Sequence, residues 1–245
     1  MKFIANYHLK TLACGLFVSF FALAHAAEPI LTSFSSAAYG AAPAPWRLGN
    51  LPGQTKPVTQ FEVVDLDGQH VLKVQADKSY GNLVHPWQGT VHALRWRWRL
   101  DKALARADLR TKAGDDIALK VCVLFDMPTD KLPLAERVQL SLARSLSREN
   151  LPAATLCYVW DRSLPVGTVL HNAYTHRLRM IVVDSGEGKL HQWTAHQRDV
   201  AADFAALFGD ESATLPPATA IGVGGDADNT ADTSLGHVGD LVATP

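Results

Sequence analysis

The sequence predicts an all-β protein, an antiparallel β-sandwich of the jelly-roll type with one or two short helices. Three observations lead to this expectation. Several segments alternate apolar and polar residues with a period of two, which indicates a sheet packed on one face. Only two segments have the periodicity of a helix. Strands and helices do not alternate regularly, as a parallel α/β fold would require.

The alternation is clearest at residues 94–100, where Leu94, Trp96, Trp98 and Leu100 are separated by arginines. We expect Trp96, Trp98, Leu119 and Val121 to be buried between two antiparallel layers. The pair Asp67-Gly68 between two apolar runs is typical of a hairpin turn. Further strands are expected at residues 70–76, 117–125, 156–160, 178–182 and 220–224.

Two helices interrupt this pattern. Residues 134–146 place Leu134, Val138, Leu142 and Leu146 on one helical face, in an excursion between two strands. The second helix is expected at residues 200–207, ending at Gly209. Residues 41–57 are rich in proline and glycine and are expected to form a loop.

The first 26 residues have the three-part layout of a secretory signal peptide. Lys2 and Lys10 precede an apolar run at 12–24, and the sequence Ala-His-Ala at 24–26 provides a cleavage site. The alternative is an uncleaved anchor. We expect a periplasmic or secreted protein, with residues 27–245 forming a single β-sandwich domain without a membrane span.

The charge balance argues against nucleic acid as a partner. The chain has 23 basic and 24 acidic side chains, a net charge of -1. Cleavage after residue 26 removes two lysines and makes the mature chain more acidic. Non-specific nucleic-acid binding needs a basic surface. The hydrophobic fraction of 47% is sufficient for a packed core.

Two cysteines, Cys122 and Cys157, remain after the leader. Both lie in segments expected to be strands. In an oxidising compartment they could form a disulfide, which would close a loop of about 35 residues and contribute roughly 3–4 kcal/mol. The alternative is two separate buried thiols.

A series of short motifs resembles a bacterial family known as domain of unknown function 3047. The motifs follow one another over residues 46–242: LRWRWRL at 94–100, ADLRTKAGDD at 107–116, LCYVW at 156–160, VDSG at 183–186, Trp193, RDV at 198–200, DF at 203–204, FG at 208–209, DADNT at 226–230 and GD at 239–240. The resemblance implies an exported protein and brings no activity with it. It also implies that this chain departs from the family at Ile117, Lys120 and Cys122, where Phe, Arg and Tyr are frequent.

An acidic segment near the C-terminus is a candidate calcium site. We expect Asp226, Asp228, Asn229 and Asp240 to supply oxygen ligands, the kind that Ca²⁺ prefers. The spacing does not fit an EF-hand loop, which needs glycine and glutamate where this chain has Ala231 and His237. The alternative is an acidic turn capped by its own side chains. No other cofactor is expected.

Aromatic and arginine side chains are the candidate ligand-binding residues. Exposed aromatic rings can stack on sugar rings, and arginines can bind anionic groups in a bidentate manner. The candidates are Trp160, Trp193, Arg198 and Arg97. The alternatives are burial of the tryptophans in the sandwich and pairing of the arginine stripe at residues 95, 97 and 99 with carboxylates.

Catalytic signatures are weak. Asp115 and Asp116 could act in acid–base chemistry at the start of a strand, or could simply form the turn that precedes it. The sequence has no nucleophile elbow, zinc-type histidine spacing or phosphate loop.

The sequence therefore favours a non-catalytic ligand-binding jelly-roll domain, with a saccharide or another cell-envelope polymer as its ligand. One alternative is a hydrolase of an envelope or extracellular polysaccharide. The other is a structural or interaction protein without a small ligand.

Overall fold

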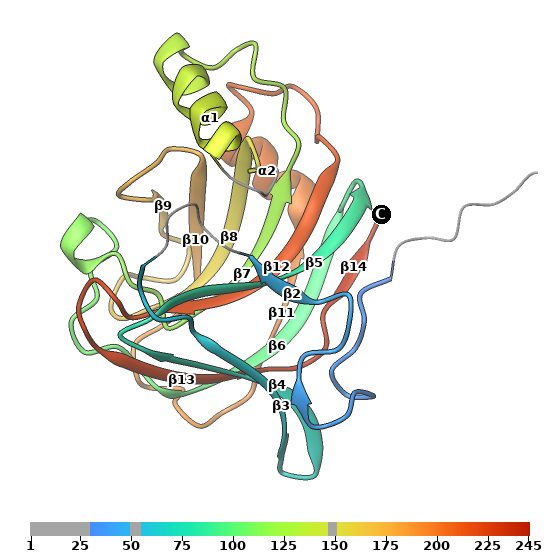
Figure 1. The fold of residues 1–245 in the computed structure, drawn as a ribbon, viewed down its shortest axis with the longest axis vertical. Coiled ribbons are helices and arrows are strands. Elements are labelled where there is room, and N and C mark those ends of the chain that lie inside the picture. The colour runs from blue at the N-terminus through green and yellow to red at the C-terminus, as the bar shows by residue number, and fades with distance from the viewer. Residues whose placement is uncertain (1–29, 50–54, 147–150) are drawn as a thin grey trace, which may run out of the picture.

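A computed structural model describes residues 30–49, 55–146 and 151–245 (Figure 1). The predicted signal peptide lies outside the described residues. The described chain forms two seven-stranded sheets that pack face to face as a curled, jelly-roll-like sandwich. The predicted fold class is thus confirmed.

Sheet A contains the strands in the order β1, β3, β4, β13, β6 and β11, and β14 pairs with β6. These strands are β1 (Gly40–Ala41), β3 (Gln60–Leu66), β4 (Gln69–Asp77), β13 (Thr233–Val238), β6 (Ala93–Lys102), β11 (Thr194–Asp199) and β14 (Val242–Thr244). All of these pairings are antiparallel. Between β3 and β4, Asp67 and Gly68 both have positive φ angles, 57° and 77°. This is the backbone that a tight hairpin requires, so the predicted turn is confirmed.

Sheet B contains the strands in the order β2, β5, β12, β7, β8, β10 and β9. They are β2 (Arg47–Gly49), β5 (Tyr80–Gly89), β12 (Ala218–Asp226), β7 (Leu119–Phe125), β8 (Ala154–Asp161), β10 (Leu178–Ser185) and β9 (Val169–His171). One pair, β8 with β10, is parallel, which departs from the purely antiparallel sandwich expected.

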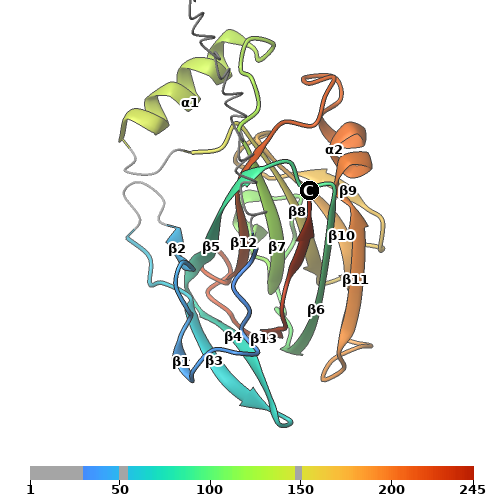
Figure 2. The same cartoon turned by 90° about the vertical axis from the view of Figure 1, so that its right-hand side faces the viewer.

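The helices lie at one end of the sandwich (Figures 1 and 2). Helix α1 (Leu134–Leu146) connects β7 to β8, as the sequence predicts. Helix α2 (Val200–Phe208) follows β11 directly, and Asp199 caps its first turn by accepting from the Ala202 backbone N–H. A short 3₁₀ turn, η1 (Lys112–Gly114), precedes β7.

The main core fills the space between the sheets. Trp96 and Trp98 of sheet A and Leu119 and Val121 of sheet B are all buried there, as predicted. A second, smaller cluster lies on the outer face of sheet B. It consists of Leu109, Ile117, Cys122, Cys157, Val159, Met180 and Val182. Sheet B is therefore partly covered on both faces. The segments that cover its outer face form the walls of a pocket there.

Candidate ligand-binding groove

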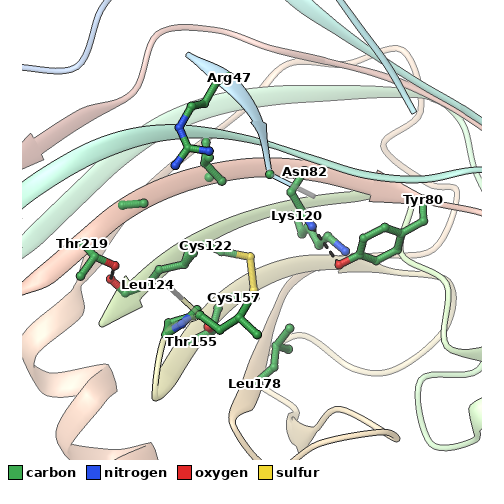
Figure 3. A pocket seen from close by; sticks show the side chains of 16 residues that line it. Arg47, Tyr80, Asn82, Lys120, Cys122, Leu124, Thr155, Cys157, Leu178 and Thr219 are labelled. Carbon is green, nitrogen blue, oxygen red and sulfur yellow. Dashed lines mark hydrogen bonds between the residues drawn. A yellow bond between two sulfur atoms is a disulfide. The ribbon is translucent and has the colours of Figure 1, made fainter. Parts of the chain in front are cut away.

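A pocket of about 310 Å³ lies on the outer face of sheet B (Figure 3). Side chains of four adjacent strands form its floor, because alternate residues of each strand point away from the main core. We call this pocket the sheet-B groove. Its lining consists of Arg47, Gly49, Tyr80, Asn82, Val84, Lys120, Cys122, Leu124, Leu151, Pro152, Thr155, Cys157, Leu178, Thr219, Ala220 and Gly222.

Most of the groove is apolar. Cys122 and Cys157 lie directly opposite each other on β7 and β8 and form a disulfide on the floor. Of the two alternatives that the sequence left open, the structure contains the bonded pair. The disulfide also belongs to the outer hydrophobic cluster, whose partly buried members Leu124 and Leu178 form part of the groove wall.

The other end of the groove is polar. Lys120 is buried, and its Nζ lies 3.0 Å from Asp226 Oδ1. The ammonium also lies 5.2 Å from the centre of the Tyr80 ring. Asn82 Nδ2 donates to Tyr80 Oη over 2.9 Å. A cation, a phenol and an amide thus meet at one end of the pocket, and Arg47, Thr155 and Thr219 add polar groups elsewhere in its lining.

Glycine at position 224 makes this arrangement sterically feasible. A Cβ at Gly224 would clash with Asn82 Oδ1 and would lie 2.7 Å from Lys120 Cε. The lysine side chain therefore crosses β12 where the strand has no side chain, and in this way it reaches Asp226.

Burial sets the electrostatics of the pair. It raises the pKa of Asp226 to about 6, with nearby Asp116 and Asp115 adding to the shift and Lys120 opposing it. Burial also disfavours the charge on Lys120, but the charge and hydrogen bond of Asp226, together with the charges of Tyr80 and Asp115, outweigh burial and hold the pKa of Lys120 above its usual range.

Three carboxylates come together beside this pair. Asp116, Asp226 and Asp228 each offer one oxygen, and these oxygens lie within 4.8 Å of one another. Asp116 also anchors the loop that follows β12, because it accepts hydrogen bonds from the backbone N–H groups of Asn229 and Thr230 at 3.1 and 2.7 Å. The cluster therefore joins the start of β7 to the end of β12.

Asp115 lies next to this cluster in a closed environment. Its Oδ2 accepts from Asn172 Nδ2 at 2.6 Å. Its Oδ1 is buried and has no hydrogen-bond partner within the described ranges. Burial raises the pKa of the Asp115 carboxyl, and the charges of Asp116 and Asp228 raise it further.

The predicted calcium ligands are only partly assembled. Asp226 and Asp228 belong to the cluster, and Asn229 contacts it through its backbone N–H. Asp240 does not belong to it. Its carboxylate accepts from the backbone N–H groups of Phe34 and Ser35 at 2.6 and 3.0 Å. Asp116, which comes from a different part of the chain, takes the place expected for Asp240.

The four predicted ligand-binding residues do not share one site. Trp160 is 2% exposed, and its Nε1 donates to the Gly186 carbonyl, so it cannot be the exposed platform that we expected. Arg198 is held by Asp203 in a bidentate ion pair at 2.6 and 2.9 Å. Arg97 and Trp193 do meet, with the guanidinium carbon 4.7 Å from the ring centre.

Arg97 belongs to a second, shallow groove on the outer face of sheet A. Arg95 and Arg97 of β6 and Ala195 and Gln197 of β11 line it side by side. Asp115 and Asp116 line neither groove. The residues proposed for catalysis and for ligand binding therefore do not converge on one cleft.

Carboxylates pair with one arginine of the stripe, Arg99, and with two arginines outside it, Arg177 and Arg179. Arg99 contacts Asp101 and Asp67 at 2.7 and 3.2 Å. Arg177 contacts Glu211 and Glu136, and Arg179 contacts Glu211. Within the stripe, carboxylate pairing, the alternative given for it, is seen at Arg99, whereas Arg97 donates to Gln69 Oε1 and lies over the Trp193 ring.

From the sequence, Lys120 was noted only as a departure from the family, and the polar end of the groove was not predicted. Lys120, Tyr80 and Asn82 come from two strands that are distant in the chain and are joined only through β12. One signal was present: Lys120 is the only charged residue in the apolar run of β7. A lysine in such a run needs a buried partner.

No helix in the described ranges is both long enough and apolar enough to cross a bilayer.

Fold and groove together define a jelly-roll-like β-sandwich with a ligand-sized groove on one outer sheet face. Residues 44–242 match the family described as "Protein of unknown function (DUF3047)". The chain belongs to this family.

Other comparisons give only distant similarity. The chain is similar to endoglucanase 3 of Trichoderma harzianum, from family GH12, with 9% identity and a TM-score of 0.42 over 83% of this chain and 99% of that one. A structure reported in a comparison of family 12 glycoside hydrolases gives 8% identity and a TM-score of 0.41 over 84% of this chain and 96% of that one. We found no match among curated proteins. Similarity at this level carries no argument about activity.

Proposed function

We propose that the protein is an exported, non-catalytic binding protein that holds its ligand in the sheet-B groove. The observation that carries this proposal is the form of the groove, a mainly apolar pocket of about 310 Å³ with a few polar side chains, of which Lys120, Tyr80 and Asn82 meet at one end. Ligand sites typically combine an apolar lining with a few polar groups that fix orientation.

A saccharide unit of an envelope polymer, with an apolar face or substituent, fits this lining. The disulfide, Leu124 and Leu178 would contact the apolar part. Asn82 and Thr155 offer hydrogen bonds to hydroxyl groups at the same surface.

The surroundings of the acids favour binding over hydrolysis. Asp116 is occupied by the loop that it anchors, and Asp115 is closed in beside Asn172. Asp226 has the raised pKa of a general acid, but it is buried against Lys120 and does not line the groove.

Export is supported by two independent features. The first 26 residues have the composition of a signal peptide. Disulfides such as Cys122–Cys157 persist mainly in oxidising compartments.

A matched pair of variants tests the groove. The mature protein is applied to an array of bacterial oligosaccharides, together with Ala220→Leu and Ala195→Leu. Ala220 lies half-buried on the floor of the sheet-B groove, whereas Ala195 is exposed in the shallow groove of sheet A. We expect Ala220→Leu to lose at least tenfold in affinity through steric overlap, and Ala195→Leu to bind like the wild type.

The reverse pattern would move the site to sheet A. Release of shortened saccharides would instead support the hydrolase alternative. Absence of binding by the wild type would leave a structural or interaction role as the better account.

We also propose that the carboxylate cluster binds Ca²⁺. Three acidic oxygens within 4.8 Å of one another repel unless a cation or protons neutralise them. The buried oxygen of Asp115 that lacks a partner is a second sign of an unsatisfied anionic site. Lys120 neutralises only part of this charge.

Thermal melts test the calcium proposal. At a calcium concentration of ~100 times Kd, binding would add about 2.7 kcal/mol and raise Tm by roughly 5 °C or more. Asp228→Asn is expected to abolish this increment, whereas Asp240→Asn, outside the cluster, retains it. Equal melts in EDTA and in millimolar calcium would exclude the site and leave protonation of Asp226 as the neutralising event.

A further inference from the structure

Helix α1 carries a row of apolar side chains that face solvent. Leu134, Val138, Leu142 and Leu146 are 74%, 60%, 59% and 70% exposed. They follow one another at intervals of four residues and therefore share one face. No residue of α1 is buried, and the helix stands at one end of the sandwich (Figures 1 and 2). We call these four residues the α1 stripe.

The opposite face of α1 attaches the helix to the body. Leu140 packs against the main core. Glu136 pairs with Arg177 at 2.9 Å, and Arg144 Nε donates to the Leu151 carbonyl at 2.8 Å. These three side chains fix which way the helix faces, so the α1 stripe points outward.

The charges beside the α1 stripe are mainly positive. Arg137 is exposed next to Val138, and Lys131 is exposed just before the helix. Asp130, next to Lys131, is the one exposed acid in the described segment 130–146, and the only acid of α1, Glu136, is turned toward Arg177 on the opposite face. An apolar face with basic side chains along it is characteristic of helices that lie in the interface of an anionic bilayer.

The size of the α1 stripe argues against a second copy of the chain as its partner. Four side chains exposed to this degree offer roughly 400–500 Å², less than the about 800 Å² per partner of a specific protein interface. Apolar patches of this size are nevertheless often functional. A lipid surface needs no complementary shape and can accept a narrow stripe.

We propose that α1 docks the protein on an anionic lipid surface, lying in the plane of the interface with the α1 stripe inserted. This inference does not depend on what the sheet-B groove binds. The position of α1 beside the sheet-B groove is informative. Side chains of α1 line a further pocket, distinct from the shallow groove of sheet A, and this pocket shares Leu151, Pro152, Thr155 and Leu178 with the sheet-B groove. Docking would therefore bring one end of the groove close to the lipid headgroups.

Vesicle co-sedimentation tests the docking. The mature protein is mixed with vesicles of equal parts phosphatidylglycerol and phosphatidylcholine, or of phosphatidylcholine alone. We expect the wild type to partition onto the anionic vesicles, and Val138→Ser/Leu142→Ser to lose at least tenfold in partitioning because two inserted side chains are gone. Arg137→Gln is expected to weaken binding to the anionic vesicles about fivefold.

The matched control is Val166→Ser/Val169→Ser, which removes two valines that are 62% and 54% exposed elsewhere on the surface. It should partition like the wild type, and all variants should retain the wild-type melting curve because none of these side chains is buried. Ala220→Leu in the groove should also leave partitioning unchanged, which separates this test from that of ligand binding.

Two results would overturn the proposal. One is partitioning that is absent, or is equal in the α1-stripe variant and its control. The other is a concentration-dependent dimer, seen by sedimentation without lipid and lost in the α1-stripe variant, which would assign the helix face to a second copy of the chain.

Discussion

Lys120 and Asp226 form a buried ion pair whose charges depend on several neighbouring residues. Each is buried, and each would be costly without its partner. Gly224 has no side chain, so the side chain of Lys120 can pass over β12 to reach Asp226. The Tyr80 ring covers the Lys120 ammonium. Removing any of these neighbours is expected to change the pKa values of Lys120 and Asp226.

The pKa of Asp226 provides a direct test at this scale. We expect the carboxyl carbon of Asp226 to titrate with a midpoint near pH 6 in ¹³C NMR spectra. Lys120→Met should raise the midpoint because the ammonium no longer favours the charged carboxylate. Lys73→Met, which removes the cation from a pair with Glu62 on sheet A, should leave it unchanged. A midpoint near the ordinary 3.8 would contradict the burial of this charge.

The sign of the effect on stability follows from the same shift. The pKa of Asp226 is higher in the folded chain than in the unfolded one, so the folded state binds the proton more tightly. The stabilisation from this group is full below pH 3.8 and is lost as the pH rises through about 6. The difference between these two pKa values corresponds to roughly 3 kcal/mol in the free energy of unfolding.

Individual residues were the hardest level to predict from sequence. Trp160 shares the strand face of Leu156 and Tyr158, so the alternation of β8 already placed it inward. Asp116 was singled out for catalysis, but its hydrogen bonds make it an anchor for the loop at 229–230. A carboxylate in a turn has the same sequence signature in either role.

Among the elements, β7 and β8 contribute most to the groove. They pair over seven residues and are linked by the disulfide at the centre of that pairing. A cross-link between two adjacent central strands restricts the unfolded chain and also forms part of the groove floor.

Loss of this disulfide should destabilise the protein. Cys122→Ala/Cys157→Ala is expected to lower the free energy of unfolding by about 3–4 kcal/mol in urea titrations, because a loop of about 35 residues is released. Reduction of the wild type should give a similar loss. If the oxidised and reduced wild type unfold at the same urea concentration, the bond does not form in solution.

Long, periodic elements were predictable and short ones were not. Residues 134–146 form a helix as expected, and the runs at 94–100 and 178–182 lie within β6 and β10. Strands β1, β2, β9 and β14 have only two or three residues, too few to show a period. The parallel pairing of β8 with β10 depends on how a long connection returns to the sheet.

At the scale of the whole molecule, the sandwich could be predicted but its strand order could not. One-sided alternation implies two layers, and it correctly buried Trp96, Trp98, Leu119 and Val121. It does not say which strands are neighbours. The polar end of the groove brings together residues 80, 120 and 226, and only the order β5, β12, β7 makes them adjacent.

This strand order has a consequence for the speed of folding. The pairs β3–β4, β7–β8 and β8–β10 join segments that are close in sequence, whereas β5–β12, β7–β12 and β4–β13 join segments about one hundred residues or more apart. Such pairings require large loops to close first, so the chain is expected to reach its native state slowly. Slow folding suits the export that we propose, because a chain that stays unfolded for longer is easier to thread through a narrow translocation channel, and the disulfide between β7 and β8 would then form after translocation.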